Sequence, residues 1–325
     1  MKTLICFIFI SLIFTSVKAA DPGGDIKINF PKKVSGLNDI QENACDLCGC
    51  YMGLDPNYSY NQVGLRYHTF KFHSDAHSVN EPQTDHESNG SESNEYYNSI
   101  ELYGRYYFTP KIKLLFSIPF SFNEIDNKQL NGAGDAKIFL QYQLYNTNID
   151  RNTKFWQRFF LGGGVKLPTG VYNKTFVYGQ LEPHFQPGTG SYDLIFSANH
   201  LMKFIKSGIG LSTDVIYSLN GENKNDYRFA NRFNVTSTAF YEITASQFTI
   251  LPHAGVYFEH ANYDKQSGNI VDDSGGDALF ATGGTDFYYK SYSLDLTFQL
   301  PVSQSLNGDQ PQNEFRIFAG VGYSF

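Results

Sequence analysis

The sequence predicts an all-β fold, a transmembrane antiparallel up-and-down β-barrel of about twelve strands, and three observations predict it. The chain ends on a segment, Glu314 to Phe325, that alternates apolar residues with mostly small or polar ones and closes on an aromatic residue. Segments with the same two-residue period recur along the chain. The connections between them are mostly short and long in alternation. A closed barrel whose outer face meets lipid has this pattern.

The first element is a segment with the form of a secretory leader. A basic residue precedes an apolar run that ends at Val17, and the small residue Ala19 follows. We therefore expect residues 1–19 to be a signal peptide. Its removal takes away Lys2 and Lys18 and changes the formal net charge from −7 to −9. An acidic mature chain argues against nucleic acid as a partner.

Residues 20–60 are predicted to be a short N-terminal periplasmic segment. It holds three cysteines within six residues, Cys45, Cys48 and Cys50, which we call the cysteine cluster. In an oxidising compartment, one disulfide plus one remaining thiol is one prediction. A soft-metal site for copper or zinc is the alternative, because clustered thiolates bind these ions. Three sulfurs fall short of the usual four-ligand structural zinc site, so both alternatives stay open, and no other cofactor is predicted.

Residues 61–325 are predicted to form the barrel. Tyr292–Leu300 and Ile112–Asn123 show the alternation most clearly, and a slip of one residue in either would turn polar side chains toward lipid. Most of the predicted strands reach the roughly 9–11 residues that cross a bilayer at a tilt. The twelve predicted strands are Gln62–Phe72, Tyr96–Phe108, Ile112–Asn123, Gly134–Tyr145, Phe155–Leu167, Ser191–Phe204, Gly208–Leu219, Tyr227–Glu242, Phe248–His260, Asp277–Tyr289, Tyr292–Leu300 and Glu314–Phe325.

The connections predict the orientation and the location. Outer-membrane barrels have short periplasmic turns and longer external loops, so an even strand number places both chain ends in the periplasm. The 23 tyrosines and 29 phenylalanines supply interfacial girdles. We therefore expect a porin-like protein in the outer membrane of a Gram-negative bacterium. Outer-membrane lipid and the barrel-assembly machinery are its expected partners, with Tyr323 and Phe325 as the insertion signal.

Charged residues of both signs fall on the inward face when the alternation is followed through each strand. In a barrel of about twelve strands, opposite charges can pair across a narrow lumen. They are predicted either to set the selectivity of a pore or to form a structural network that keeps the interior rigid. The predicted lumen residues are Glu101, Arg105, Lys113, Asp135, Lys137, Arg158, Lys166, Asp193, Arg232, Asp295 and Arg316.

Three glycine-containing motifs carry a family resemblance. They are Gly132-Ala133-Gly134-Asp135, the run from Gly162 to Gly170 (GGGVKLPTG), and the run from Gln186 to Asp193 (QPGTGSYD). Together they resemble the signatures of an outer-membrane barrel family labelled as transporters or as phenol-degradation meta-pathway proteins. The resemblance covers roughly residues 132–325 and implies passage of small organic molecules.

Three functions follow as alternatives. The leading one is an outer-membrane channel or transporter for a small solute, which the family resemblance implies to be organic. The second is a barrel-anchored protein that uses the cysteine cluster for soft-metal or redox chemistry, and the third is a structural barrel without transport. No enzymatic activity is predicted: Ser197 and His200 lie on opposite faces of one strand, and nucleophile-elbow, phosphate-loop and His-Glu-x-x-His patterns do not occur in the sequence.

Overall fold

The computed structural model of the chain describes residues 60–74, 93–125, 128–147, 153–176, 179–180 and 183–325. All of them belong to one compact unit, Gln41–Phe325. The predicted leader and the cysteine cluster lie outside the described residues. None of the helical segments in the described ranges has the length and apolar character to cross a membrane.

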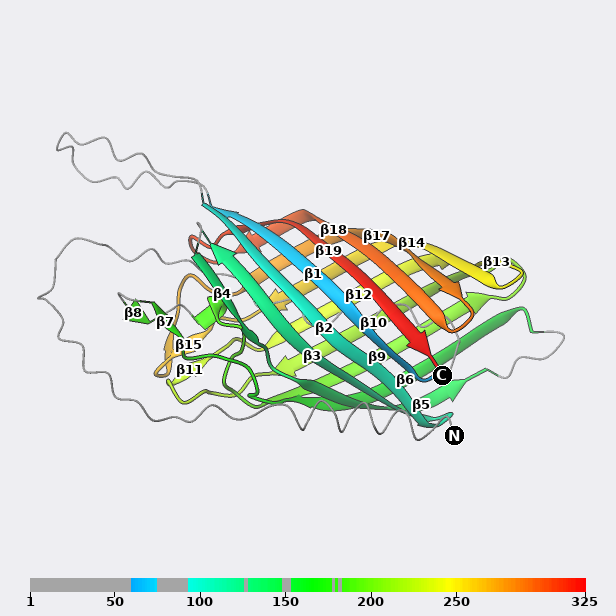
Figure 1. Cartoon of the computed structure of the whole chain (residues 1–325), viewed down its shortest axis with the longest axis horizontal. Helices are drawn as coiled ribbons and strands as arrows, with labels where there is room; N and C mark the ends of the chain where they lie inside the picture. The colour runs from blue at the N-terminus through cyan, green and yellow to red at the C-terminus, as the bar shows by residue number, and fades with distance from the viewer. Residues whose placement is uncertain (1–59, 75–92, 126–127, 148–152, 177–178, 181–182) are drawn as a thin grey trace, which may run out of the picture. The chain divides into compact units, whose positions relative to one another are not determined.

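Twelve long strands of the described ranges form one closed antiparallel barrel (Figure 1). Each pairs with its neighbours in chain order, β12 with β14 included, and the pairing of the first strand, β1, with the last, β19, closes the ring. The all-β, up-and-down barrel of twelve strands is therefore confirmed. The strands are β1 (Gln62–Ser74), β2 (Ser93–Thr109), β3 (Ile112–Ile125), β5 (Lys137–Asn146), β6 (Phe155–Lys166), β9 (Asp193–Phe204), β10 (Ile209–Leu219), β12 (Arg232–Tyr241), β14 (Phe248–Ala261), β17 (Gly276–Tyr289), β18 (Tyr292–Leu306) and β19 (Gln312–Ser324).

The two ends of the barrel differ. One end, which we call the short-turn end, carries the tight connections 110–111, 205–208 and 290–291, and there Gln62 lies opposite Ser324. The other end, the long-loop end, carries the longer connections and the minor elements (Figure 1). These are β4 (Lys128–Ala133), β7 (Thr175–Phe176), β8 (Gly179–Gln180), η1 (Pro183–Phe185), β11 (Tyr227–Arg228), β15 (Lys265–Gln266) and β16 (Asn269–Ile270), while β13 (Ile243–Ala245) lies at the short-turn end.

Two predicted boundaries are wrong for identifiable reasons. The strand predicted from Tyr227 begins only at Arg232, because β11 pairs instead with β15 in a separate three-stranded sheet. The strand predicted to end at Leu300 continues to Leu306. Its pairing with β17 resumes beyond Pro301 through an extra residue, Val302, so the final connection is shorter than predicted.

The outward face of the barrel is apolar and is edged with aromatic side chains. Large exposed residues such as Leu140, Leu161 and Val321 cover its middle, each about half exposed. An aromatic girdle surrounds the short-turn end, as expected where strands leave the hydrocarbon layer. It consists of Tyr106, Phe108, Tyr145, Phe204, Tyr241, Phe248, Tyr289, Tyr292, Tyr323 and Phe325. A closed ladder with this outer surface confirms a barrel of the outer membrane.

Candidate functional site

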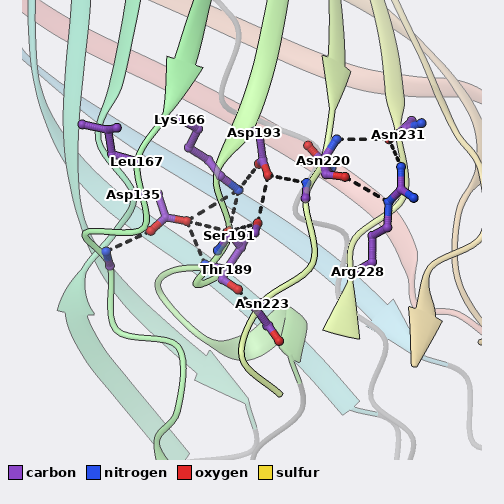
Figure 2. A network of polar contacts seen from close by, with 12 residues as sticks. Asp135, Lys166, Leu167, Thr189, Ser191, Asp193, Asn220, Asn223, Arg228 and Asn231 are labelled. Carbon is purple, nitrogen blue, oxygen red and sulfur yellow. Dashed lines mark hydrogen bonds and ion pairs between the residues drawn. The ribbon is translucent and has the colours of Figure 1, made fainter. Parts of the chain in front are cut away.

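The three glycine-containing motifs, far apart in sequence, meet at the long-loop end of the lumen. The segment before β5 lies beside the segment after β6, since Val171 N–H donates to the carbonyl of Ala133 at 2.9 Å. The segment before β9 lies beside both, since Gly188 N–H donates to the carbonyl of Val171 at 2.8 Å. Figure 2 shows the polar side chains that these three segments bring together.

Asp135 is the centre of this network. Its Oδ1 accepts a hydrogen bond from Gly170 N–H at 2.9 Å, and its Oδ2 accepts from Thr189 N–H at 2.8 Å and from the Thr189 hydroxyl at 2.7 Å (Figure 2). The Asp135 carboxylate, in the segment before β5, thus holds one residue of each of the other two motifs. Hydrogen bonds to an ionised group are stronger than neutral ones, so Asp135 is the main tie between the three segments.

Lys166 and Asp193 extend the network across β6 and β9, where they are register partners. Lys166 Nζ makes an ion pair with Asp193 Oδ2, lies 3.5 Å from Asp135 Oδ2 and donates to the Thr189 hydroxyl at 2.5 Å. Asp193 Oδ1 accepts from the Ser191 hydroxyl at 2.9 Å and from Gly221 N–H at 3.0 Å. All of these side chains are buried, so the pairing is protected from solvent screening.

The motif glycines allow the close approach that this network requires. A Cβ atom on Gly170 would lie 2.7 Å from Gly188 Cα and 2.8 Å from Asp135 Oδ1. No side chain fits there, because real Cβ atoms essentially never make contacts that short. The two backbones therefore touch only because both positions are glycine.

The residues Pro183–Ser191, which we call the strap, are held at several further points. Asn123 Nδ2 of β3 donates to the carbonyl of Phe185 at 2.8 Å, and the Phe185 ring packs edge-on against Tyr97 of β2. Asn223 Nδ2, in the loop after β10, donates to the carbonyl of Thr189 at 2.8 Å. The strap thus joins β6 and β9 to β2, β3 and the neighbouring loops.

A buried carboxylate in the loop after β14 holds the other side of the strap. Asp264 Oδ2 lies 2.5 Å from His184 Nε2 and accepts from the Tyr227 hydroxyl at 2.5 Å, while its Oδ1 accepts from Ala230 N–H at 2.7 Å. Burial opposes ionisation of Asp264, but the adjacent His184 ring and the hydrogen bonds outweigh it and lower the pKa of Asp264 to about 2. The contacts of Asp264 with His184, Tyr227 and Ala230, which we call the clasp, therefore contain an ionised carboxylate at neutral pH.

A cavity of ≈ 170 Å³ lies next to the strap. Gln186, Pro187 and Thr189 of the strap line it on one side, and residues of β1, β2, β3, β10 and β12 line it on others. The predicted residues Glu101, Asp135, Lys137, Lys166, Asp193 and Arg232 are all part of its wall. The sequence therefore pointed to cavity residues, but not to their arrangement around the strap.

An ionic layer lies on the inner side of the neighbouring strands β18, β19, β1 and β2. Arg66 lies 3.6 Å from Glu101 Oε2 and 3.6 Å from Asp295 Oδ2, and His68 Nε2 lies 3.4 Å from Glu101. Asp295 reaches past β19 because the residue there is Gly320, on which a Cβ would lie 2.4 Å from Asp295 Oδ1. In this layer the predicted residues Glu101 and Asp295 lie on either side of Arg66, which the sequence analysis did not single out.

The remaining predicted lumen residues have separate environments. Arg316 makes two hydrogen bonds to the Glu259 carboxylate, at 2.9 and 2.7 Å, and lies 3.9 Å from the centre of the Phe280 ring. Lys113 lies 4.1 Å from the centre of the Phe160 ring, Arg158 lies beside the same ring, and Arg105 donates to Gln62 Oε1 at 3.1 Å. These contacts fit the structural alternative, and a role for any of them in selectivity stays a prediction.

An apolar layer lies on the inner side of the barrel near the short-turn end. Trp156, Leu201, Phe240 and Leu251 pack together and are each at most 3% exposed. They come from β6, β9, β12 and β14 and face inward, between strand positions that are mostly polar. The sequence analysis missed this layer, although an apolar residue on the predicted polar face of four strands near one end was a signal that could have found it.

The metal prediction is untested. Among the described residues, no group of three or more histidine, cysteine or acidic side chains is placed to hold a metal ion. The cysteine cluster lies outside those residues, so binding of copper or zinc by Cys45, Cys48 and Cys50 stays a prediction.

The chain belongs to the protein family described as MetA-pathway of phenol degradation, whose model matches residues 101–306. This agrees with the resemblance carried by the three motifs. Among solved structures, the fold is similar to an outer-membrane channel from Pseudomonas putida, with 15% identity, 84% of this chain and 100% of that chain covered, and a TM-score of 0.59.

A more distant match is the β-domain of the Bordetella autotransporter BrkA, with 11% identity, 81% of this chain and 99% of that chain covered, and a TM-score of 0.44. Another is the translocator domain of the autotransporter NalP from Neisseria meningitidis, with 11% identity, 84% of this chain and 91% of that chain covered, and a TM-score of 0.40. No curated protein gives a significant sequence match.

Proposed function

We propose that this outer-membrane barrel is a channel for a small organic solute, which passes through the lumen beside the strap. The observation that carries the proposal is the cavity of ≈ 170 Å³ inside the barrel, whose wall combines aromatic, amide and charged side chains. Binding sites for small molecules combine apolar surface with a few placed polar groups in this way. The P. putida structure of similar fold is that of an outer-membrane channel, which supports the proposal.

The strap and the apolar layer define where transport would be limited. The strap lies beside the cavity at the long-loop end, which is the external end by the rule that outer-membrane barrels have short periplasmic turns. Trp156, Leu201, Phe240 and Leu251 pack together on the inner side of the barrel near the other end. A solute that crosses the lumen passes this apolar layer, so we expect the layer to narrow the path and to keep the conductance low.

The apolar layer also favours a second candidate, a structural barrel without transport. The two candidates differ in one measurement. Purified, folded protein is added to a planar lipid bilayer in potassium chloride, with the boiled protein as control, and folding is checked by the different gel migration of unboiled and boiled samples. Discrete current steps support the channel. A folded sample that inserts but never conducts would refute the channel and support the structural barrel.

A further inference from the structure

We propose that the cavity beside the strap binds a small uncharged solute that carries hydroxyl or amide groups and one apolar face, and that Asn234 is a residue that recognises it. This inference rests on the proposed channel function and specifies its substrate class. It is argued from the charge balance of the wall, from one buried acceptor and from the apolar side of the cavity.

The wall of the cavity carries charges that balance. Its basic side chains are those of Lys137, Lys166 and Arg232, and its acidic ones are those of Glu101, Asp135 and Asp193, with His68 beside Glu101. Three positive and three negative charges produce no net field of one sign. The cavity therefore gives neither an anion nor a cation an electrostatic advantage over an uncharged molecule.

The acidic groups of the wall are also engaged already. Asp135 and Asp193 share Lys166, and Glu101 lies between Arg66 and His68. Arg232 acts electrostatically on Asp264, behind the strap. A cation would have to displace a buried partner from one of these carboxylates, which leaves an uncompensated charge in the protein interior.

The wall offers an uncharged hydrogen-bonding group that has no partner within the described part of the chain. Asn234 of β12 is 4% exposed, lines the cavity, and its Oδ1 accepts no hydrogen bond there. This oxygen is covered in the present conformation and is costly to leave unsatisfied, so a rotation of the Asn234 amide that brings it to a donor from a molecule in the cavity is favourable. Asn123 and Asn220 place further amides along the same wall.

The cavity also has an apolar side. Phe70 and Tyr97 line it from β1 and β2, Ile195 from β9, and Phe229 from the loop before β12. Aromatic faces next to amide groups bind solutes that have both C–H surface and hydroxyl or N–H donors. The combination selects a polar but uncharged molecule with an apolar face, rather than a free ion or a hydrocarbon.

The first test measures the charge preference of the open state. Reversal potentials are recorded for single channels under a potassium chloride gradient. The wild-type protein should show a potential near zero, because neither ion is preferred. Asn234→Asp adds one negative charge to the balanced cavity at constant side-chain size and should raise the permeability ratio of potassium to chloride several-fold. Asn269→Asp makes the same change on the exposed strand β16 and should leave the ratio unchanged.

The second test measures uptake into proteoliposomes of three sugars of matched size: glucose, the anion glucuronate and the cation glucosamine. Glucose should enter roughly 10-fold faster than either ion, and Asn234→Ala should slow glucose several-fold. A wild-type channel that conducts but strongly prefers one ion, or that takes up a charged sugar as fast as glucose, would overturn this inference and leave the channel standing. A folded protein that neither conducts nor takes up any sugar would overturn the channel and this inference together.

Discussion

Replacing Asp135 by asparagine tests whether one carboxylate holds the strap in the lumen. The substitution keeps the size of the side chain but exchanges one of two acceptor oxygens for an NH₂ group. The remaining oxygen can still accept from Gly170 N–H, whereas the NH₂ group would face the N–H of Thr189, which now donates to Oδ2. The attraction to Lys166 Nζ, 3.5 Å away, is lost as well.

The expected magnitude follows from these contacts. A hydrogen bond to an ionised group contributes about 1.5–3 kcal/mol, and a neutral one about 1 kcal/mol. Losing the Thr189 N–H bond and weakening the Gly170 bond should together lower the free energy of local opening of the strap by about 3 kcal/mol. Since about 1.4 kcal/mol corresponds to a factor of ten, the strap should open roughly 100-fold more often.

Hydrogen exchange of the purified barrel in detergent measures this opening. In Asp135→Asn, the amides of Gly170 and Thr189 should exchange roughly 100-fold faster, while the amides of the barrel strands keep their wild-type rates. Asp272→Asn is the matched control, because Asp272 is exposed in the loop after β14. Equal exchange at Gly170 and Thr189 in the wild type and Asp135→Asn would refute the central role of Asp135.

Three further residues and the cysteine cluster give testable outcomes. Leu201→Ala should open the apolar layer and raise single-channel conductance, and an unchanged conductance would show that this layer does not limit flow. The pKa of Asp264 is lowered to about 2 from an unfolded value near 3.9, so the clasp around it should be fully stable above about pH 4 and lost as the pH falls toward 2. The NMR signal of the Ala230 amide follows this loss. A clasp that opens between pH 7 and 5 would contradict this expectation. Phe325→Ala should lower the yield of assembled barrel more than Phe204→Ala, a change at another exposed aromatic of the same end, and equal yields would contradict the insertion signal. Reduced protein should take up copper(I) or zinc, and replacement of all three residues of the cysteine cluster by serine should abolish uptake without affecting heat-modifiable migration; uptake that persists in this variant would place the metal elsewhere.

The strands could be predicted because each carries its own signal. In Tyr292–Leu300 every second residue faces lipid, and the period alone fixes which side chains point inward. The boundary of β18 could not be predicted, because Pro301 normally interrupts a ladder and only the extra residue Val302 restores the pairing with β17. The start of β12 was missed because Tyr227 pairs with β15, a short strand in the loop after β14, and this pairing depends on the tertiary fold.

The site was predictable in its parts but not in its assembly. Asp135, Lys166 and Asp193 each stood on the inward face or in a motif, yet their meeting at Thr189 depends on the path of the long loop between β6 and β9. The contact of His184 with Asp264 joins residues 80 positions apart in two different loops. Neither loop has a periodic pattern, so no local rule relates them.

The placement of Arg66 has a consequence for how the barrel assembles. Arg66 lies on the first strand, and its partners Glu101 and Asp295 lie on β2 and β18, so the ionic layer spans the junction where the first and last strands meet. Joining the two ends of a long chain carries the largest loop-closure entropy of any pairing in the barrel, which makes it a late event. Until then Arg66 and Asp295 stand near opposite edges of an open sheet, hydrated and apart. The ion pair between Arg66 and Asp295 therefore forms only when the barrel closes. An intermediate in which β1 and β19 are still unpaired lacks it.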